Sequence, residues 1–264
     1  MKSLNNYNHP FHMTSNSPWP LIMSTNVMNL MLNIFIWMNF SNFIPMIMGM
    51  FSILLIMFQW WRDLIRESLF QGSYTTMIYN NMKFCMLLFI SSELMFFISF
   101  FWTYFHSFLS PNIEIGMQWP PMNISPFNPF NIPLMNTIIL ISSSSTITWS
   151  HHAMLNNKYN SSILSMMSTI TLSMIFMYFQ YLEYSNSKFS INDSIYGSIF
   201  FMTTGFHGTH VIIGSIFLSI NLIRMMNKQF SSHNHFGMEA SIWYWHFVDM
   251  IWLFLFMLIY WWSI

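Results

Sequence analysis

Long apolar stretches, separated by short polar ones, limit what this chain can fold into more than any other feature. Seven such stretches have about 20 residues or more, the length of helix that crosses roughly 30 Å of hydrocarbon. They cover residues 19–40, 43–61 with an extension to about 70, 76–109, 132–151, 161–184, 194–226 and 239–262. Only 6% of the residues are charged, against roughly 25% in a soluble domain. The sequence therefore predicts an all-α integral membrane protein with seven transmembrane helices.

The distribution of basic residues predicts the orientation of these spans. If the N-terminus lies inside, the inner polar segments receive seven of the eight basic residues: Lys2, Arg62, Arg66, Lys83, Lys158, Arg224 and Lys228. The outer segments receive Lys188. This arrangement satisfies the positive-inside rule and places the C-terminus outside. Eight basic and eight acidic residues cancel, so the charge gives no reason to expect a nucleic-acid partner.

One carboxyl group lies deep inside an apolar span. Glu93 stands in the sequence SSELMFF, where an ionised carboxylate would be costly and would tend to be protonated or paired. Ionisable groups inside a membrane are usually functional. The sequence predicts a proton-linked or lipid-facing carboxyl group, and the alternative is a carboxyl group that a neighbouring helix satisfies.

The segment QWWRDLIRES at 59–68 places two arginines on one helical face. Arg62 and Arg66 are four residues apart, and Trp60 and Trp61 precede them. Arginine can bind a lipid phosphate through two N–H groups, so these four residues are candidates for lipid binding at the membrane interface. A salt-bridged helix end that packs against a partner subunit explains the pattern equally well.

The ten histidines raise the question of a metal or haem site. Haem ligation in a helical bundle usually needs two histidines at similar depth on facing helices, and His207 and His246 are a weak pair of that kind. Hydrogen bonds between helices explain them better, so no metal site is predicted. His246 also shares a helical face with Asp249, three residues later, and the two are expected to form a structural polar pair. The single cysteine, Cys85, excludes a multi-cysteine metal site within the chain.

Three further polar or small-residue patterns are expected to pack helices together. Asn26, Asn29 and Asn33 form a stripe on the first span, and hydroxyl residues run through 142–146 of the fourth. Both patterns favour hydrogen bonds between helices over a transport path. The glycines within 205–214 are expected to let a neighbouring helix approach closely.

Several segments, taken in order, resemble cytochrome c oxidase subunit III. They include QWWRDLIRES at 59–68, SELMFF at 92–97, TITWSHH at 146–152, DSIYGSIFFMTTGFHGTHVIIG at 193–214 and HFGMEASIWYWHFVDMIWLFLF at 235–256. No single segment is decisive, but the ordered set is specific, and the resemblance covers essentially the whole chain.

The resemblance implies one transmembrane domain over residues 1–264, with helices one and two at about 19–70 and helices three to seven at about 76–262. In that family a V-shaped, lipid-filled cleft separates the first two helices from the other five. The subunit docks on subunit 1 of the oxidase, which passes electrons from cytochrome c to oxygen with proton pumping. Haem a, haem a3 and copper lie in partner subunits. This chain would carry no redox centre and no catalytic residue, and would support proton uptake and the stability of the catalytic subunit.

The resemblance also implies sites, partners and a location. Glu93 corresponds to the family's membrane-embedded carboxylate, and Arg66 and Arg224 are candidate contacts for phospholipid, such as cardiolipin, phosphatidylglycerol or phosphatidylethanolamine. Subunit 2, small accessory subunits and other respiratory complexes in a supercomplex are further expected partners. The expected location is the mitochondrial inner membrane, with the N-terminus in the matrix and the C-terminus in the intermembrane space. The 28 methionines also favour a mitochondrial genome that reads an additional codon as Met.

Two rival functions belong to other classes. A proton-coupled membrane transporter would need several ionisable groups inside the membrane, broken helices and often an internal repeat, and no repeat is visible. A haem-bearing membrane subunit would need the histidine pair that the sequence supplies only weakly.

Overall fold

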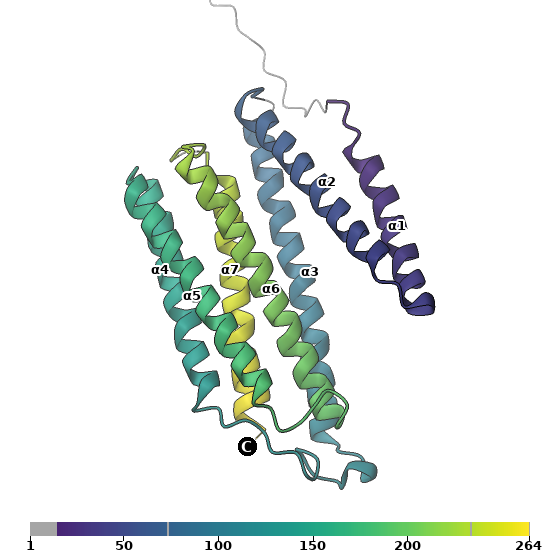
Figure 1. Cartoon of the computed structure of the whole chain (residues 1–264). Helices are drawn as coiled ribbons and strands as arrows, with labels where there is room; N and C mark the ends of the chain where they lie inside the picture. The colour runs from purple at the N-terminus through teal and green to yellow at the C-terminus, as the bar shows by residue number, and fades with distance from the viewer. Residues whose placement is uncertain (1–14, 73, 233, 264) are drawn as a thin grey trace, which may run out of the picture. The chain divides into compact units, whose positions relative to one another are not determined.

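The computed structural model describes residues 15–72, 74–232 and 234–263, and within these residues it is helical and contains no strand (Figure 1). The α-helices are α1 (Trp19–Phe40), α2 (Ile44–Leu69), α3 (Thr76–Leu109), α4 (Ile132–Leu155), α5 (Tyr159–Ser185), α6 (Ile195–Met226) and α7 (Phe236–Leu255). A short 3-10 helix, Ile113–Ile115, lies between α3 and α4, and α7 continues as a π-helical turn, Phe256–Trp261.

Each predicted apolar stretch overlaps one of these helices, although α4, α5 and α7 begin or end a few residues outside the predicted bounds. Six of the helices within the described residues are long and apolar enough to cross a membrane. The helix outside that group is α4, whose hydroxyl residues at 142–146 lower its apolar character. The chain is thus a multi-pass membrane protein, as the apolar stretches predict.

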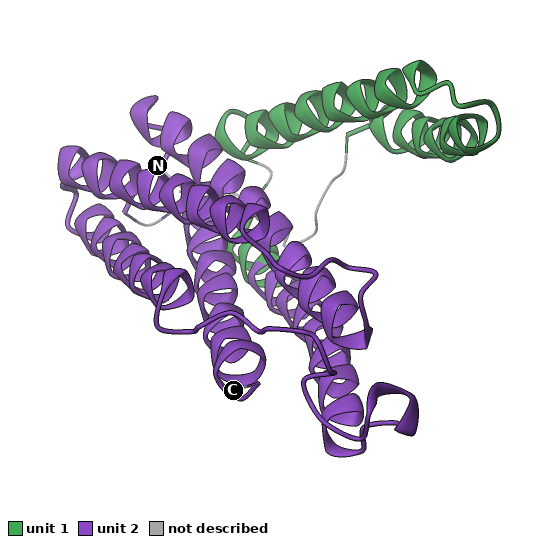
Figure 2. Cartoon of the chain, turned by 60° about the horizontal axis from the view of Figure 1, so that its bottom comes forward, with its two compact units in different colours: residues 1–82 green, residues 83–264 purple. Residues whose placement is uncertain are grey.

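The chain divides into two compact units, residues 1–82 and 83–264, and the boundary falls near the start of α3 (Figure 2). In the first unit, α1 and α2 are joined by a short turn and pack side by side (Figure 1). The Asn33 side chain donates to the carbonyl of Pro45 at 3.0 Å, and the Ser52 hydroxyl donates to Asn26 Oδ1 at 2.9 Å. The expectation that the asparagine stripe joins helices is confirmed for these two asparagines.

The second unit is built around α7, which packs against α4 and α6. The hydroxyl run of α4 makes the expected bonds between helices. Ser143 Oγ accepts a hydrogen bond from Trp245 Nε1 at 3.0 Å, and Thr146 Oγ1 lies 2.9 Å from Thr169 Oγ1 on α5. These bonds satisfy polar groups that hydrocarbon could not.

The glycines of α6 behave differently from one another. A Cβ atom added at Gly214 would lie 3.0 Å from Trp245 Cε3, so α7 approaches α6 closely at this point. A Cβ atom at Gly208 would have no heavy atom within 4 Å among the described residues, apart from its own helix backbone. The prediction of close packing is confirmed at Gly214 and is wrong at Gly208, because spacing along a helix does not reveal which face a neighbour covers.

The chain runs up and down through the second unit, and four of the five basic residues of this unit lie at one end. The start of α3, the connection between α4 and α5, and the connection from α6 to α7 lie at this end (Figure 1). They carry Lys83, Lys158, Arg224 and Lys228. Lys188 lies between α5 and α6, at the opposite end. Lys2 lies outside the described residues.

Candidate functional site

Glu93, the carboxyl group predicted to lie deep in an apolar span, is paired with a histidine of α6. Its Oε2 atom lies 2.9 Å from Nε2 of His210. The side chain of His210 is 10% exposed and that of Glu93 is 26% exposed, so the pair is largely covered. The helices α3 and α6 bring the two residues together although 117 positions separate them in the sequence.

The hydrogen bonds of His210 determine how many protons the pair holds. Nδ1 of His210 lies 2.6 Å from the carbonyl oxygen of Phe206, and because a carbonyl oxygen only accepts, Nδ1 must carry a hydrogen. A bond between Nε2 and the carboxyl oxygen of Glu93 requires one further proton on either atom. Whether that proton resides on the imidazole or on the carboxyl group, the pair as a whole is neutral. A neutral pair explains how a carboxyl group can be accommodated in an apolar span.

Aromatic rings surround the imidazole of His210. The centroid of Phe97 lies 5.0 Å away in an edge-on arrangement, and Tyr244 and Phe247 lie at 6.4 Å. Glu93 is the side chain that hydrogen-bonds His210 among the described residues. The pair therefore lies among aromatic rings, of which Tyr244 also carries a hydroxyl group.

His246 and Asp249 lie close to each other but share no hydrogen bond. His246 Nδ1 lies 4.0 Å from Asp249 Oδ2, and it lies closer, at 2.9 Å, to the hydroxyl oxygen of Ser144 on α4. Asp249 is 7% exposed. The role of these two residues as a structural polar pair remains a prediction, and Ser144 is the contact that joins His246 to another helix.

The two histidines considered for haem are held by neighbouring helices. His207 is 1% exposed, and its Nε2 atom lies 3.2 Å from the carbonyl oxygen of Val248 on α7. His246 is bonded to Ser144 as described above. Both histidines thus contribute to contacts between helices, in the way that the sequence favours.

In the first unit, the two arginines among the lipid-binding candidates lie beside a single carboxylate, that of Asp63. Asp63 Oδ1 lies 3.1 Å from the guanidinium of Arg62 and 3.8 Å from that of Arg66, and Oδ2 accepts from Trp19 Nε1 at 2.8 Å. The Arg66 side chain is 60% exposed, so most of its N–H groups face the surroundings. Trp61 is also exposed, and Trp60 is half-buried.

Arg224, the remaining lipid-binding candidate, lies near the end of α6. Its guanidinium carbon lies 4.4 Å above the ring of Phe230, and its Nε donates to Gln229 Oε1 at 3.3 Å. A Cβ atom at Gly237 would lie 2.5 Å from Nη1 of Arg224. The absence of a side chain at Gly237 therefore leaves room for the arginine beside the start of α7.

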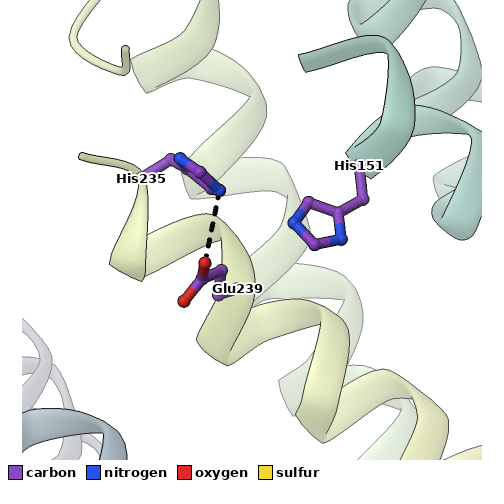
Figure 3. A group of neighbouring side chains, drawn as sticks. All are labelled: His151, His235 and Glu239. Carbon is purple, nitrogen blue, oxygen red and sulfur yellow. Dashed lines mark ion pairs between the residues drawn. The ribbon is translucent and has the colours of Figure 1, made fainter. Parts of the chain in front are cut away.

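Sequence reasoning missed two buried polar clusters. Glu183 is 1% exposed and accepts a hydrogen bond of 2.5 Å from the hydroxyl of Tyr260. At the other end of the second unit, nitrogen atoms of His151 and His235 and an oxygen atom of Glu239 all lie within 4.8 Å of one another (Figure 3). Glu183 could have been found from the sequence, because it is a carboxyl group within a predicted apolar span. The second cluster depends on how a helix end and a loop meet, which sequence spacing does not give.

Comparisons with known proteins agree with the ordered motifs. The family model described as cytochrome c oxidase subunit III matches residues 9–264. A protein named cytochrome c oxidase subunit 3 from Rhipicephalus sanguineus is 53% identical over 254 residues, which are 96% of this chain and 99% of the relative. The proteins of that name from Heterololigo bleekeri and Locusta migratoria are 51% and 50% identical over 97% and 98% of this chain, and over 98% of each relative.

Proposed function

Because the chain belongs to the cytochrome c oxidase subunit III family, we propose that it binds phospholipid and supports the catalytic subunit of the oxidase without carrying a redox centre itself. The chain is a subunit of cytochrome c oxidase, respiratory complex IV, which is an oxidoreductase. The haems and copper belong to partner subunits, with subunit 1 as the main contact and subunit 2 and small accessory subunits as further neighbours. Because the chain belongs to this family, the alternative interpretation as a proton-coupled transporter is set aside.

The observation that carries the proposal concerns the histidines. A haem would need two histidines free to approach its iron from opposite sides. His207 and His246 are the pair that the sequence places at similar depth on two spans. His207 instead uses Nε2 for the carbonyl of Val248, and His246 uses Nδ1 for the hydroxyl of Ser144. These contacts favour a role for both histidines in packing helices.

The pair of Glu93 and His210 is the part of this chain best suited to influence protons. It holds one exchangeable proton between two side chains, and that proton can reside on either of them without a change in the total charge. Such a pair can respond to the field of a neighbouring subunit at little energetic cost. Through it the chain would support proton uptake by the catalytic subunit, with Glu93 as the membrane-embedded carboxylate.

Phospholipid binding is assigned to the arginines and tryptophans at the helix ends. Arg62 and Arg66 share one carboxylate, Asp63, while each guanidinium carries five N–H donors. The remaining donors suit a lipid phosphate, and Trp60 and Trp61 suit the interfacial region beside it. Arg224 offers a further cation in the second unit. Cardiolipin, phosphatidylglycerol and phosphatidylethanolamine all carry the phosphate that these residues would bind.

The topology that goes with this function has seven membrane spans. One of them is α4, although its hydropathy alone does not identify it as a span. The 24 residues of α4 are long enough to cross the hydrocarbon, and its hydroxyl groups are bonded within the protein. The basic end of the second unit would face the mitochondrial matrix, in keeping with the positive-inside rule. A lipid-filled, V-shaped cleft would separate helices one and two from the other five.

Removal of this chain from the purified oxidase tests the proposal. The chain is dissociated with detergent, and haem, copper and phospholipid phosphorus are measured in both fractions. Haem and copper should remain with the other subunits, while their phospholipid content should fall. Stoichiometric haem or copper in the fraction that holds this chain would contradict the proposal.

The substitution Glu93→Gln separates the assembly of the redox centres from proton uptake. Glutamine keeps a side chain of the same size and can still bond His210, but it cannot exchange a proton. The haem spectrum of the purified oxidase should be unchanged, whereas proton uptake during turnover should slow. Loss of the haem spectrum would mean that Glu93 is needed to build the redox centres, which contradicts the division of roles proposed above.

A further inference from the structure

His151, His235 and Glu239 meet where α4 ends and α7 begins, away from the pair of Glu93 and His210. His151 lies in the last turns of α4, His235 immediately precedes α7, and Glu239 lies in the first turn of α7. Figure 3 shows the two imidazoles approaching the carboxylate from different segments. The cluster is enclosed, since the side chains of His235 and Glu239 are 4% and 14% exposed.

The hydrogen bond of His235 leaves a lone pair directed at the carboxylate. Nδ1 of His235 lies 3.0 Å from the carbonyl oxygen of Ser231, so Nδ1 donates a hydrogen there. In the neutral ring, Nε2 is then an acceptor. This nitrogen lies 3.3 Å from Glu239 Oε1 but makes no hydrogen bond with any described residue. When the ring is neutral, two acceptors therefore face each other; when it is protonated, the same two atoms form the ion pair drawn in Figure 3.

His151 adds a second buried nitrogen without a hydrogen-bond partner to the same place. Its Nε2 atom is buried and has no hydrogen-bond partner among the residues that the structure describes. The ring centroids of His151 and His235 lie 5.6 Å apart. Buried polar atoms without partners are costly, and a cation bound between the two imidazoles would remove this cost for both histidine nitrogens at once.

The geometry points to a binding site for a redox-inactive divalent cation of the zinc class, held by His151, His235 and Glu239. Two imidazole nitrogens and one carboxylate oxygen are a ligand set that zinc uses when it keeps a fourth position for water. Ligand atoms about 2.0–2.1 Å from a tetrahedral ion lie about 3.3–3.4 Å apart. The observed 3.3 Å between His235 Nε2 and Glu239 Oε1 matches that edge. His151 completes the set with a small movement, since all three ligand atoms lie within 4.8 Å.

The surroundings of the cluster also resemble those of a metal site. The bond from His235 to the Ser231 carbonyl fixes the ring in the tautomer that a metal requires, as the outer partners of zinc-bound histidines do. Lys83 lies on the other side of Glu239, with Nζ 2.7 Å from Oε2, and leaves Oε1 turned toward the histidines. The bound cation would join the end of α4 to the start of α7. Lys83 would oppose it electrostatically and so weaken its binding.

Zinc binding by the assembled oxidase tests the inference. Purified complexes are dialysed against buffers of fixed free Zn²⁺ concentration, and bound zinc is measured by mass spectrometry. The partner subunits are the same in every preparation, so the difference between wild type and variant reports on this site. His151→Asn and His235→Gln should each remove one bound Zn²⁺ or weaken its binding at least about tenfold, as is typical when metal coordination is disturbed.

His152→Asn is the matched control, because His152 is adjacent to His151 but exposed. It should leave zinc binding unchanged. Lys83→Met gives the opposite sign, since removal of a neighbouring positive charge should tighten zinc binding several-fold. A general disturbance of the fold would not tighten it. Only complexes with normal haem content are compared, so that misassembled variants are excluded.

Thermal stability supplies a second readout. A ligand that binds the folded state raises the unfolding temperature, so Zn²⁺ should stabilise the wild type and the His152→Asn complex but not the His151→Asn complex. If His151→Asn binds zinc as the wild type does, if His152→Asn weakens binding equally, or if Lys83→Met weakens it, the proposed site is wrong.

Discussion

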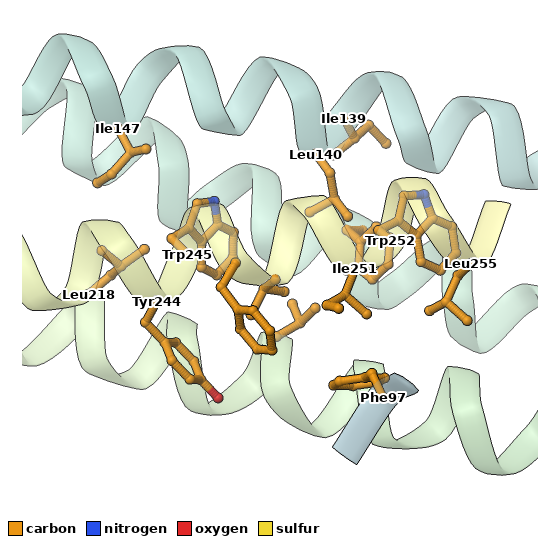
Figure 4. Packing of buried hydrophobic residues seen from close by; sticks show 14 of the residues in the cluster. Phe97, Ile139, Leu140, Ile147, Leu218, Tyr244, Trp245, Ile251, Trp252 and Leu255 are labelled. Carbon is orange, nitrogen blue, oxygen red and sulfur yellow. The ribbon is translucent and has the colours of Figure 1, made fainter. Parts of the chain in front are cut away.

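The two units of this chain bury their helices to very different extents. In the most apolar window of α1 no residue is buried, and in that of α2 only 11% are. The corresponding window of α7 and its π-helical continuation is 56% buried. Figure 4 shows the reason in the second unit, where Trp245, Trp252 and their neighbours fill the space between helices.

This difference shows that apolar helices in one chain can be stabilised in different ways. The second unit has a core of its own, in which side chains interdigitate. The first unit is a pair of helices whose apolar side chains lie mostly outside any core of this chain, so lipid or a partner subunit has to cover them. We expect substitutions to act mainly through packing in the second unit, and through a few polar contacts in the first.

The largest expected effect on the free energy of unfolding comes from replacing one tryptophan in each unit by alanine. Trp245 is fully buried, and Trp245→Ala should lower the free energy of unfolding by about 3–5 kcal/mol, because the cavity left behind cannot close fully. Trp37 in α1 is 44% exposed, and Trp37→Ala should change the free energy of unfolding by about 0.5 kcal/mol or less. Unfolding of the chain in mixed micelles, followed by circular dichroism, measures both. Equal losses for the two variants would contradict the comparison.

A milder variant separates the two contributions of Trp245. Trp245→Phe keeps most of the ring packing but removes the hydrogen bond to Ser143. Hydrogen bonds between membrane helices average about 0.6 kcal/mol, so this variant should retain most of the stability. A loss as large as that of the alanine variant would mean that the hydrogen bond dominates over packing.

Sequence patterns could predict the helices but not the faces on which they meet. The apolar stretches are local features, so the positions of the spans follow from them. The pair of Glu93 and His210 depends on the rotation of α3 and α6 about their axes, and no local pattern reports that rotation. Glu93 could be recognised as a carboxyl group that needs a partner, whereas the identity of that partner could not.

The same limit explains α4 and the cluster at its end. The hydroxyl residues of α4 lower its hydropathy, and only the structure shows that Ser143 and Thr146 bond neighbouring helices. His151 and His235 come together because the end of α4 lies beside the connection that leads into α7. Their separation in the sequence carries no signal for that meeting.

Two glycines of α6 allow a closely packed position and an open position to be compared within the second unit. A side chain at Gly214 would meet Trp245 and Tyr244 at 3.0–3.4 Å, so Gly214→Leu should lower the free energy of unfolding by about 1–3 kcal/mol through overpacking. Gly208→Ala places a methyl group in open space and should raise it by about 0.5–1 kcal/mol, because alanine favours helix. Unfolding in mixed micelles measures both the expected loss of stability for Gly214→Leu and the expected gain for Gly208→Ala. Destabilisation by both variants would show that the face around Gly208 is also closely packed.

The smallest expected effect tests the polar contacts of the first unit. Asn33 donates to the carbonyl of Pro45 at 3.0 Å, and Asn33→Ala should lower the stability of the α1–α2 pair by about 0.6 kcal/mol, the average for such bonds in a membrane. Asn29 lies on the same stripe but is exposed, so Asn29→Ala is the matched control and should change stability less. Protection of α1 amides from hydrogen exchange in micelles measures the two variants locally. If Asn33→Ala cost as much as Trp245→Ala, the first unit would depend on a single polar contact as strongly as the second unit depends on its core. Equal small effects of both asparagine variants would instead mean that the covering lipid, and not the hydrogen bond, holds the pair together.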